Sequence, residues 1–371
     1  MRSALLILSG YNMRAVIALC RWAHGAGVPA YLVARHARDP IYDTAYRAQV
    51  IAERADPTLS VAALADWMTA VRGAAGVDQV VLVPSTEFLN RFLLAHRAAL
   101  ESCGGIVPLV DAAVYAQLSD KRAFSDLCMA HGIRVPQRAA NVPDTVPFVA
   151  KPVHYGAASS GQIKPYLVRT AADRAAFLAR EDVSRFYCEE YVEGESVYLL
   201  LHRARCGRVT ATAQQNLMQQ AAGGSIVLAR YDDFHDQEAA QPYFRLLEAV
   251  GFHGLLMIEV RRDPATGAAV MIEANPRLWG PMQFTLDRHV DLFTPWLADV
   301  GVDVPTTTPT TPARPYYFWS GGLHTSAQPV AWHSFDSQSF VHDYPRIAAC
   351  DLFARADTLR LHARELQEIA A

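Results

Sequence analysis

Residues 257–279 read Met257-Ile-Glu-Val-Arg-Arg-Asp-Pro-Ala-Thr-Gly-Ala-Ala-Val-Met-Ile-Glu-Ala-Asn-Pro-Arg-Leu-Trp279. Two strongly apolar stretches flank the turn-forming residues 263–267, and this pattern predicts a β-hairpin. Because alternate residues of a strand share a face, Glu273, Asn275 and Arg277 are expected to project together. Pairing of the strands about the turn would bring Glu259 opposite or diagonal to Glu273.

Two carboxylates held close on a buried surface repel each other, and burial adds to the cost of ionising them. A hard divalent cation resolves this conflict. Glu259, Glu273 and Asn275 offer the oxygen ligands that Mg²⁺ accepts when phosphates complete its coordination. The neighbouring Arg277 suits an anionic, phosphorylated species. The alternative is an ordinary hairpin with one surface glutamate on each strand.

Composition limits the remaining possibilities. A chain of 371 residues is expected to form two or three domains. Its 51% hydrophobic and 19% charged residues are typical of a soluble globular protein, and a net charge of −3 argues against a general nucleic-acid or membrane surface. The six cysteines lack close spacing, which indicates reduced thiols in a cytoplasmic protein. No apolar run approaches membrane-spanning length.

The first third of the chain alternates strand and helix patterns. Strands are expected at residues 4–8, 29–33 and 79–83, and helices at 13–24, 61–73 and 88–100. This alternation predicts an open parallel sheet with helices on both faces, and ligands of such sheets bind beyond the carboxyl ends of the strands. Loops 9–12 and 84–87 are therefore candidate contacts, although Ser85 or Thr86 could simply cap a helix. The first turn lacks Gly-x-Gly-x-x-Gly, which weakens an oxidoreductase interpretation.

A second group of candidate residues lies between residues 148 and 195. A short strand ends in Lys151 and precedes the small-residue loop 156–161, a combination that can surround phosphate oxygens. The acidic stretch 187–195 follows another strand and would by default be a solvated turn. It also suits a nucleoside, with the backbone of Glu190 and Val192 against adenine and Glu195 accepting ribose hydroxyls. The polar segment 214–225 is predicted to be a long loop.

The order of these motifs resembles the ATP-grasp superfamily, in particular its carboxylate–amine ligases. Ser119-Asp-Lys-Arg-Ala-Phe124 and Phe148-Val-Ala-Lys-Pro152 look like the two nucleotide-contacting lysine segments, with 156–161 in the place of the phosphate-covering loop. Glu189-Glu-Tyr-Val-Glu-Gly-Glu195 is similar to the adenine hinge and ribose-binding acid. Glu259 and Ile272-Glu-Ala-Asn-Pro-Arg277 match the paired magnesium-binding acids, asparagine and arginine. The resemblance covers roughly residues 118–280.

The resemblance implies a mixed α/β and α+β chain in four parts. An N-terminal parallel βαβ domain of the pre-ATP-grasp type would occupy residues 1–117. The two lobes of an ATP-grasp fold would follow at 118–187, which carries the phosphate loop, and at 188–303, which carries the metal site. A Thr/Pro-rich connector and a C-terminal segment, 304–371, match no motif of the family.

The resemblance also implies an activity, in which a small carboxylate is activated by ATP as an acylphosphate and then coupled to an amine. Arg277 and Lys151 would be the catalytic residues, and Glu259, Glu273 and Asn275 would hold magnesium, with two ions expected and Mn²⁺ as a substitute. The nucleotide would be bound by the residues of the lysine segments, the small loop and the hinge: Lys121, Lys151, Ser159, Ser160, Glu189, Glu190, Tyr191, Val192 and Glu195. Residues 156–161 and 219–225 are the predicted lids.

The expected partners are the small-molecule carboxylate and amine substrates, with no nucleic acid and no membrane. A homodimer formed through the first domain is the assembly that the resemblance suggests. Two other activities stay open. One is bicarbonate activation, as in carboxylases and carbamoyl phosphate synthesis, and the other is ATP binding without catalysis.

Overall fold

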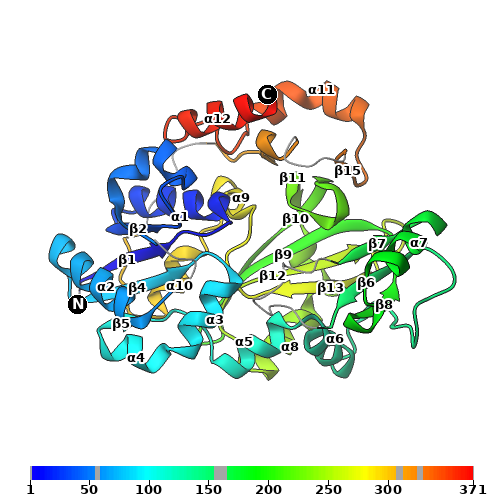
Figure 1. Cartoon of the computed structure of the whole chain (residues 1–371), viewed down its shortest axis with the longest axis horizontal. Coiled ribbons are helices and arrows are strands. Elements are labelled where there is room, and N and C mark those ends of the chain that lie inside the picture. The colour runs from blue at the N-terminus through cyan, green and yellow to red at the C-terminus, as the bar shows by residue number, and fades with distance from the viewer. Residues whose placement is uncertain (1, 55–58, 154–164, 306–311, 324–328, 371) are drawn as a thin grey trace.

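The computed structural model describes residues 2–54, 59–153, 165–305, 312–323 and 329–370 (Figure 1). Five parallel strands form the N-terminal sheet, in the order β3-β2-β1-β4-β5. The strands are β1 (Ser3–Leu8), β2 (Ala30–Ala34), β3 (Val50–Glu53), β4 (Gln79–Pro84) and β5 (Gly105–Ile106). The helices between them are α1 (Met13–Gly25), α2 (Val61–Ala75), α3 (Glu87–Ala95) and α4 (Arg97–Ser102). The predicted parallel βαβ domain is confirmed, and β3 is an additional strand.

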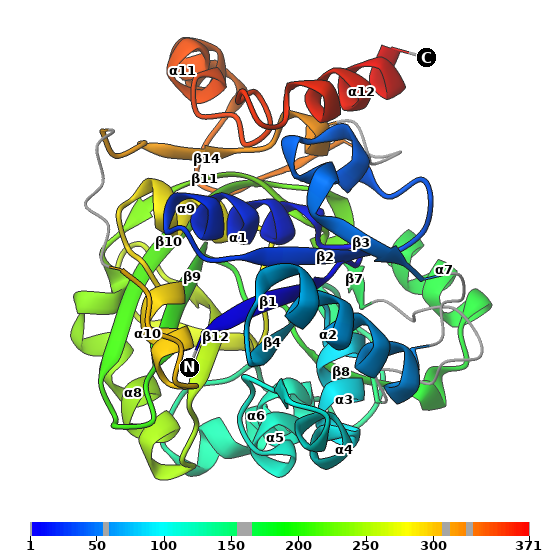
Figure 2. The ribbon, with the colours of Figure 1, turned by 90° about the vertical axis from the view of Figure 1, so that its left-hand side faces the viewer.

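The alternation of apolar residues along β1 explains how this sheet packs. Leu5 and Ile7 point to the side covered by α1, whereas Leu6 and Leu8 point to the side covered by α2. Each face of the sheet is therefore buried under a helix, as parallel sheets require (Figure 2). Two further helices, α5 (Ala112–Ser119) and α6 (Lys121–Ala130), lead out of this domain.

Two antiparallel sheets make up the rest of the molecule (Figure 1). The smaller has the order β7-β6-β8 and consists of β6 (Phe148–Pro152), β7 (Tyr166–Val168) and β8 (Phe186–Glu190), with α7 (Ala171–Arg180) beside it. The larger has the order β13-β12-β9-β10-β11-β14. Its strands are β9 (Glu195–Arg203), β10 (Val209–Gln219), β11 (Ile226–Asp232), β12 (Gly254–Arg262), β13 (Ala269–Asn275) and β14 (Tyr316–Phe318).

The two faces of the larger sheet pack against different halves of the chain. Leu199 and Leu201 of β9 belong to a core with α5, α6 and α8 (Gln241–Ala249). Tyr198 and Leu200 face the other way, into a core shared with α1, α9 (Met282–Asp287) and α10 (Phe293–Ala298). The second face thus meets the N-terminal domain, and it is the face that carries the polar residues of the candidate site.

One segment departs from the sequence prediction. Residues 214–219, predicted as part of a long loop, continue strand β10, and only a short 3₁₀ turn at Ala221–Gly223 separates β10 from β11. The side chain of Gln219 donates to Gly224 O at 2.8 Å, and Arg14 donates to Ser225 Oγ at 2.8 Å. Residues 219–225, predicted as a lid, therefore comprise the end of β10 and a short turn that these two hydrogen bonds hold in place. The first predicted lid, 156–161, lies outside the described residues.

The segment after the Thr/Pro-rich connector joins both halves of the molecule. Strand β14 pairs with β11, and β15 (Ala331–Trp332) pairs with β10. Helices α11 (Ser337–Ala348) and α12 (Leu359–Ala370) follow, and α12 lies beside the N-terminal domain through an ion pair between Arg364 and Asp43 (Figure 1). Within the described ranges, none of the helices combines the length and apolar character needed to cross a bilayer.

The ionisation of Glu365 in α12 provides a test of how α12 packs on the rest of the molecule. Burial, followed by the charge of Asp351, raises the pKa of Glu365 to about 7, although Trp319 Nε1 donates to its carboxylate at 3.1 Å. Below about pH 4.5 the carboxyl is neutral in folded and unfolded chains alike. As the pH rises towards 7 the unfolded chain ionises first, so the folded state loses stability until the folded pKa is passed.

Glu365→Gln is therefore expected to leave the free energy of unfolding nearly unchanged at pH 4.5. At pH 8 it should raise that free energy by on the order of 2 kcal/mol relative to the wild type. Urea unfolding of both proteins at the two pH values measures this difference. An equal effect at both values would contradict the burial of an acid with a raised pKa.

Candidate active site

The hairpin of β12 and β13 brings the two acidic candidates together. Glu259 pairs directly with Glu273 across the antiparallel ladder, as the sequence predicted, and the register shifts just beyond this pair. Both lie on the face of the larger sheet that meets the N-terminal domain. Glu259 is 6% exposed, so this carboxylate is removed from water. Glu273 is half-buried, and its charge acts with burial to raise the pKa of Glu259, as expected for two neighbouring carboxylates.

Glu273 is stabilised in its charged form. Burial acts to raise its pKa, but the charge of Lys121, hydrogen bonds from Lys121 and Asn275, and the charge of Lys151 outweigh burial and lower the pKa to about 2. Lys121 forms an ion pair with Glu273, and Asn275 Nδ2 donates to Glu273 Oε1 at 2.8 Å. Lys121, at the start of helix α6, thus brings the first lysine segment into contact with the hairpin.

The pKa of Glu259 is shifted in the opposite direction, towards the neutral form. Burial and the charge of Glu273 raise its pKa, against the charge of Arg261 and a hydrogen bond from Ser196. Ser196 Oγ donates to Glu259 Oε1 at 3.2 Å, and an Arg261 Nη2 lies 3.3 Å from the same oxygen. A pair in which one carboxylate is charged and the other resists ionisation fits a cation, which would favour the charged form of both.

Sequence reasoning missed the polar residues that support Glu259. Asn216 Nδ2 donates to Ser196 Oγ at 2.9 Å, and Gln214 Nε2 donates to Asn216 Oδ1 at 2.8 Å. All three residues are fully buried, and they form a chain of hydrogen bonds that ends at Glu259. The spacing of Gln214 and Asn216 was the available signal, because residues two apart share a strand face.

Lys151 is held by residues from two sheets. It is 5% exposed, forms an ion pair with the buried Glu189 on the neighbouring strand β8, and donates to Ile272 O of β13 at 3.2 Å. Lys151 and Lys121 therefore both reach the strand that carries Glu273. Two of the cofactor-binding candidates, Ser159 and Ser160, lie outside the described residues.

The hinge candidates lie at the end of β8 and directly after it. The backbone N–H of Glu190 donates to Gln137 O at 2.9 Å, so this donor is already used within the protein. Tyr191 lies beside Arg169, whose Nη2 donates to the phenol at 3.3 Å. Val192 and Glu193 continue the segment into Gly194, whose φ of 132° is accessible to glycine.

The predicted ribose acid, Glu195, is already engaged at the start of β9. Gln215 Nε2 donates to Glu195 Oε1 at 2.7 Å, and Arg262 Nη2 donates to Glu195 Oε2 at 2.6 Å. The same guanidinium also binds Asp232, with its Nη2 2.7 Å from Asp232 Oδ2. The carboxylate of Glu195 is thus held in place by side chains from β10 and β12.

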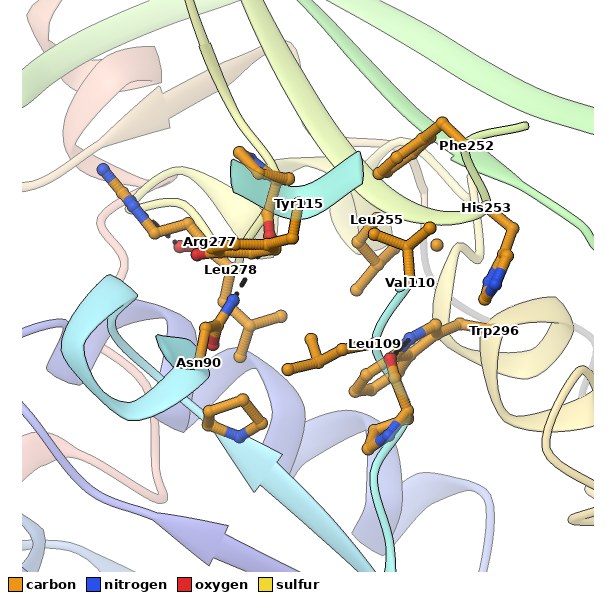
Figure 3. Close-up of a pocket in the computed structure, with 14 residues that line it drawn as sticks. Asn90, Leu109, Val110, Tyr115, Phe252, His253, Leu255, Arg277, Leu278 and Trp296 are labelled. Carbon is orange, nitrogen blue, oxygen red and sulfur yellow. Dashed lines mark hydrogen bonds between the residues drawn. The ribbon is translucent and has the colours of Figure 1, made fainter. Parts of the chain in front are cut away.

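Arg277 lies at the end of the hairpin, where it borders a small apolar pocket (Figure 3). Its Nη2 donates to Asn275 Oδ1 at 2.8 Å, which joins the arginine to the Glu273–Asn275 pair. Asn90 and Tyr115 line the same pocket from the N-terminal side. The Oδ1 of Asn90 is buried and has no hydrogen-bond partner among the described residues. A bound water or small polar ligand would satisfy it.

Comparisons with known proteins address the fold of this chain. The chain matches no protein-family model and no curated protein sequence. It is similar to the solved structure of pyruvate carboxylase from Rhizobium etli, with a TM-score of 0.58 and 18% identity over 84% of this chain. The match spans 29% of that much longer protein.

Two shorter structures give similar matches. One is the biotin carboxylase domain dimer of 2-oxoglutarate carboxylase from Hydrogenobacter thermophilus, solved with ADP, magnesium and bicarbonate (TM-score 0.58, 12% identity, 84% of this chain and 73% of that chain). The other is the ADP complex of purK, N5-carboxyaminoimidazole ribonucleotide synthetase (TM-score 0.57, 16% identity, 85% of this chain and 80% of that chain). The chain has the ATP-grasp fold. The architecture predicted from the sequence, a parallel N-terminal domain followed by antiparallel lobes, is confirmed.

In this fold the two lysines, the hairpin acids and Arg277 meet at or beside strand β13. Among the described residues, no group of three or more His, Cys, Asp or Glu is arranged to hold a metal ion. The available donors are two carboxylates and one amide, which bind Mg²⁺ well only when phosphate oxygens complete the coordination. The donor set therefore fits a metal that arrives with a nucleotide.

Proposed function

We propose that the chain is an ATP-dependent ligase that activates a small carboxylate, such as an amino acid, and couples it to an amine with release of ADP and phosphate. The observation that carries this proposal is the direct cross-strand pairing of Glu259 with Glu273, within reach of Lys121 and Lys151. This arrangement suits the transfer of a phosphoryl group. Its negative charge would be neutralised by the two lysines and by the metal that the paired acids hold. The ADP and magnesium in the similar structures support the same cofactors here.

The roles of the residues follow from their positions. Lys121 and Lys151 would exchange their carboxylate partners for the phosphates of ATP, which frees Glu273 for the metal. Magnesium bound by Glu259, Glu273 and Asn275, as two ions, would neutralise the charge of the transferring group. Arg277, held by Asn275, would steady the transferred phosphoryl group or the acylphosphate that the carboxylate forms. The amine would then displace phosphate and form the amide.

Nucleotide binding would involve the strand β8 and the start of β9. Because the N–H of Glu190 is used by Gln137, adenine would be recognised through the carbonyl of Glu190 and the backbone of Val192. Tyr191 and Glu189 would flank this contact, and Glu195 would accept hydrogen bonds from the ribose. Ser159 and Ser160, on the small-residue loop, are proposed to contact the phosphates.

A second candidate function is bicarbonate activation. The similar structures favour it, because one is a biotin carboxylase domain with bicarbonate bound and another is a carboxyaminoimidazole ribonucleotide synthetase. The biotin carboxylase domain is also a dimer, which supports a homodimer for this chain. Binding of ATP without catalysis is the weakest alternative, because a binding module has no need of Arg277 and the complete acid set.

Phosphate release from Mg-ATP tests these alternatives. The purified chain is supplied with pools of amino acids and small carboxylic acids, with and without added amines, and in a parallel series with bicarbonate. Phosphate and ADP together with a new dehydrative mass would establish the ligase. Turnover only with bicarbonate would favour the second function, and AMP with pyrophosphate would refute the acylphosphate route. ATP binding without turnover in any series would favour the binding module.

The chain of hydrogen bonds behind Glu259 gives a finer prediction. Ser196→Ala removes the hydroxyl that donates to Glu259 Oε1 and leaves Arg261 beside the same oxygen. We expect the magnesium concentration for half-maximal turnover to rise about tenfold, with turnover at saturating magnesium nearly unchanged. Thr212→Val removes a buried hydroxyl from β10, the strand that pairs with the β9 strand of Ser196, and is the matched control. An unchanged magnesium requirement in Ser196→Ala would remove the proposed orienting role.

A further inference from the structure

Two arginines follow neighbouring strands of the N-terminal sheet. Arg35 comes directly after β2, and Arg54 directly after β3. Both strands run parallel to β1 (Figure 2). The two arginines and the loop Ser9-Gly-Tyr-Asn12 therefore lie at the same edge of the sheet. This is the carboxyl edge, where open α/β sheets bind their ligands.

Arg54 is buried and Arg35 is half-buried, and neither forms an ion pair with a residue that the structure describes. Arg54 is 8% exposed, and its Nη2 donates to the backbone oxygen of Ser9 at 2.6 Å. The guanidinium of Arg35 lies over the ring of Tyr11, 4.2 Å from its centroid. The Nε atoms of both arginines are buried and have no hydrogen-bond partner among the described residues. Such orphaned donors are uncommon in folded proteins, and they indicate a missing acceptor.

Asp39, the carboxylate that lies within this group among the described residues, does not supply that acceptor. Asp39 is 1% exposed and accepts hydrogen bonds from Ser9 Oγ at 2.8 Å and from the backbone N–H of Arg35 at 2.8 Å. It also accepts from Ile41 N at 3.0 Å. Its oxygens therefore hold the loop after β2, while the Nε donors of Arg35 and Arg54 have no acceptor among the described residues. Burial, followed by the neighbouring charge of Arg35, lowers the pKa of Arg54 in spite of Asp39.

The same edge lies against the hairpin that carries Arg277. Asn12, in the loop next to Arg35 and Arg54, donates through Nδ2 to Leu278 O at 3.0 Å. From α3, Asn90 donates to Pro276 O at 3.2 Å. Tyr11, between these contacts and Arg35, is 88% exposed. A ligand bound by the two arginines would therefore lie between the N-terminal domain and the end of the hairpin, next to the exposed ring of Tyr11.

We propose that Arg35 and Arg54 bind an oxyanion, the carboxylate or phosphate of one of the two small-molecule substrates. Guanidinium groups bind both kinds of oxyanion through charge-assisted, often paired hydrogen bonds, and each arginine here has a buried donor available. The assignment rests on the proposed function, which requires two substrates to meet near Arg277. It restricts the substrate pair, since at least one member carries an anionic group besides the carboxylate that is activated.

Calorimetric titration with inorganic phosphate, and separately with succinate, tests the site. Both are titrated into the whole chain, in the absence of nucleotide and again with the ATP analogue AMP-PNP and magnesium present. We expect the wild type to bind at least one of them, and Arg35→Gln to weaken that binding at least about tenfold. Phosphate alone would identify a phosphorylated substrate, and succinate a carboxylate. Arg54→Gln should have the same effect, but Arg35→Gln decides the test because its less buried side chain leaves the fold intact.

Arg38→Gln is the matched control, since Arg38 lies in the same loop and is exposed. Equal affinities in the wild type and Arg35→Gln would overturn the proposal, as would a wild type that binds neither oxyanion. Binding of AMP-PNP, measured in the same series, is expected to be unchanged in all variants. A chain that binds the oxyanion but no nucleotide would contradict the proposed ligase while leaving the arginine site in place, so the two failures are distinguishable.

Discussion

Replacing Glu273 with alanine is expected to reduce magnesium-dependent turnover by on the order of 10³-fold while the fold remains intact. Glu273 is the acid that the protein already holds in its charged form, with a pKa near 2, and it lies directly opposite Glu259. Without it, the metal loses a permanent anionic ligand, and Glu259 alone is an acid whose pKa is raised. Lys121, its ion-pair partner, would remain able to bind phosphate.

The measurement is phosphate release at several magnesium concentrations, together with nucleotide affinity in the absence of magnesium. We expect turnover to fall and metal-free nucleotide affinity to stay within a few fold of the wild type. Glu248→Ala changes an exposed glutamate of α8 and is the control. The double variant Glu259→Ala/Glu273→Ala should be about as inactive as Glu273→Ala, because both acids would serve one metal site. Wild-type rates in Glu273→Ala would eliminate the metal assignment.

Local information in the sequence was enough to predict the hairpin. The turn at residues 263–267 fixes which residues oppose one another, and strand alternation fixes which of them share a face. The pairing of Glu259 with Glu273 follows from these local features and needs no contact with a distant segment of the chain. The same reasoning located the strand that ends in Lys151 and most strands and helices of the N-terminal domain.

Contacts between distant segments were beyond this reasoning. Nothing in the sequence around Lys121 indicates that its partner is Glu273, because the pairing arises only when α6 packs on β13. The Gln-rich segment 214–219 was wrongly predicted as a loop, since polar residues usually mark solvent exposure. In the folded chain its side chains find buried partners such as Ser196, so tertiary structure overrides the local pattern.

Replacing Lys151 with methionine is expected to affect stability and activity for two separable reasons. The ion pair between Lys151 and Glu189 is almost completely buried, with side chains 6% and 5% exposed. Loss of the lysine would leave the Glu189 carboxylate buried and unpaired, a change that typically costs about 3–5 kcal/mol of folding free energy. Loss of its ammonium from the proposed phosphate site should also reduce turnover about 10²-fold or more.

A second substitution separates the two effects. Lys151→Met/Glu189→Gln removes the unpaired charge, so most of the lost stability should return in urea unfolding, whereas turnover should stay low because no cation is restored. Glu189→Gln alone keeps Lys151 and its hydrogen bond to Ile272 O, and should retain far more activity than either variant that lacks the lysine. Recovery of turnover in the double variant would show that Lys151 acts only through the stability of its ion pair. An unchanged unfolding free energy in Lys151→Met would show instead that the pair contributes nothing to the fold.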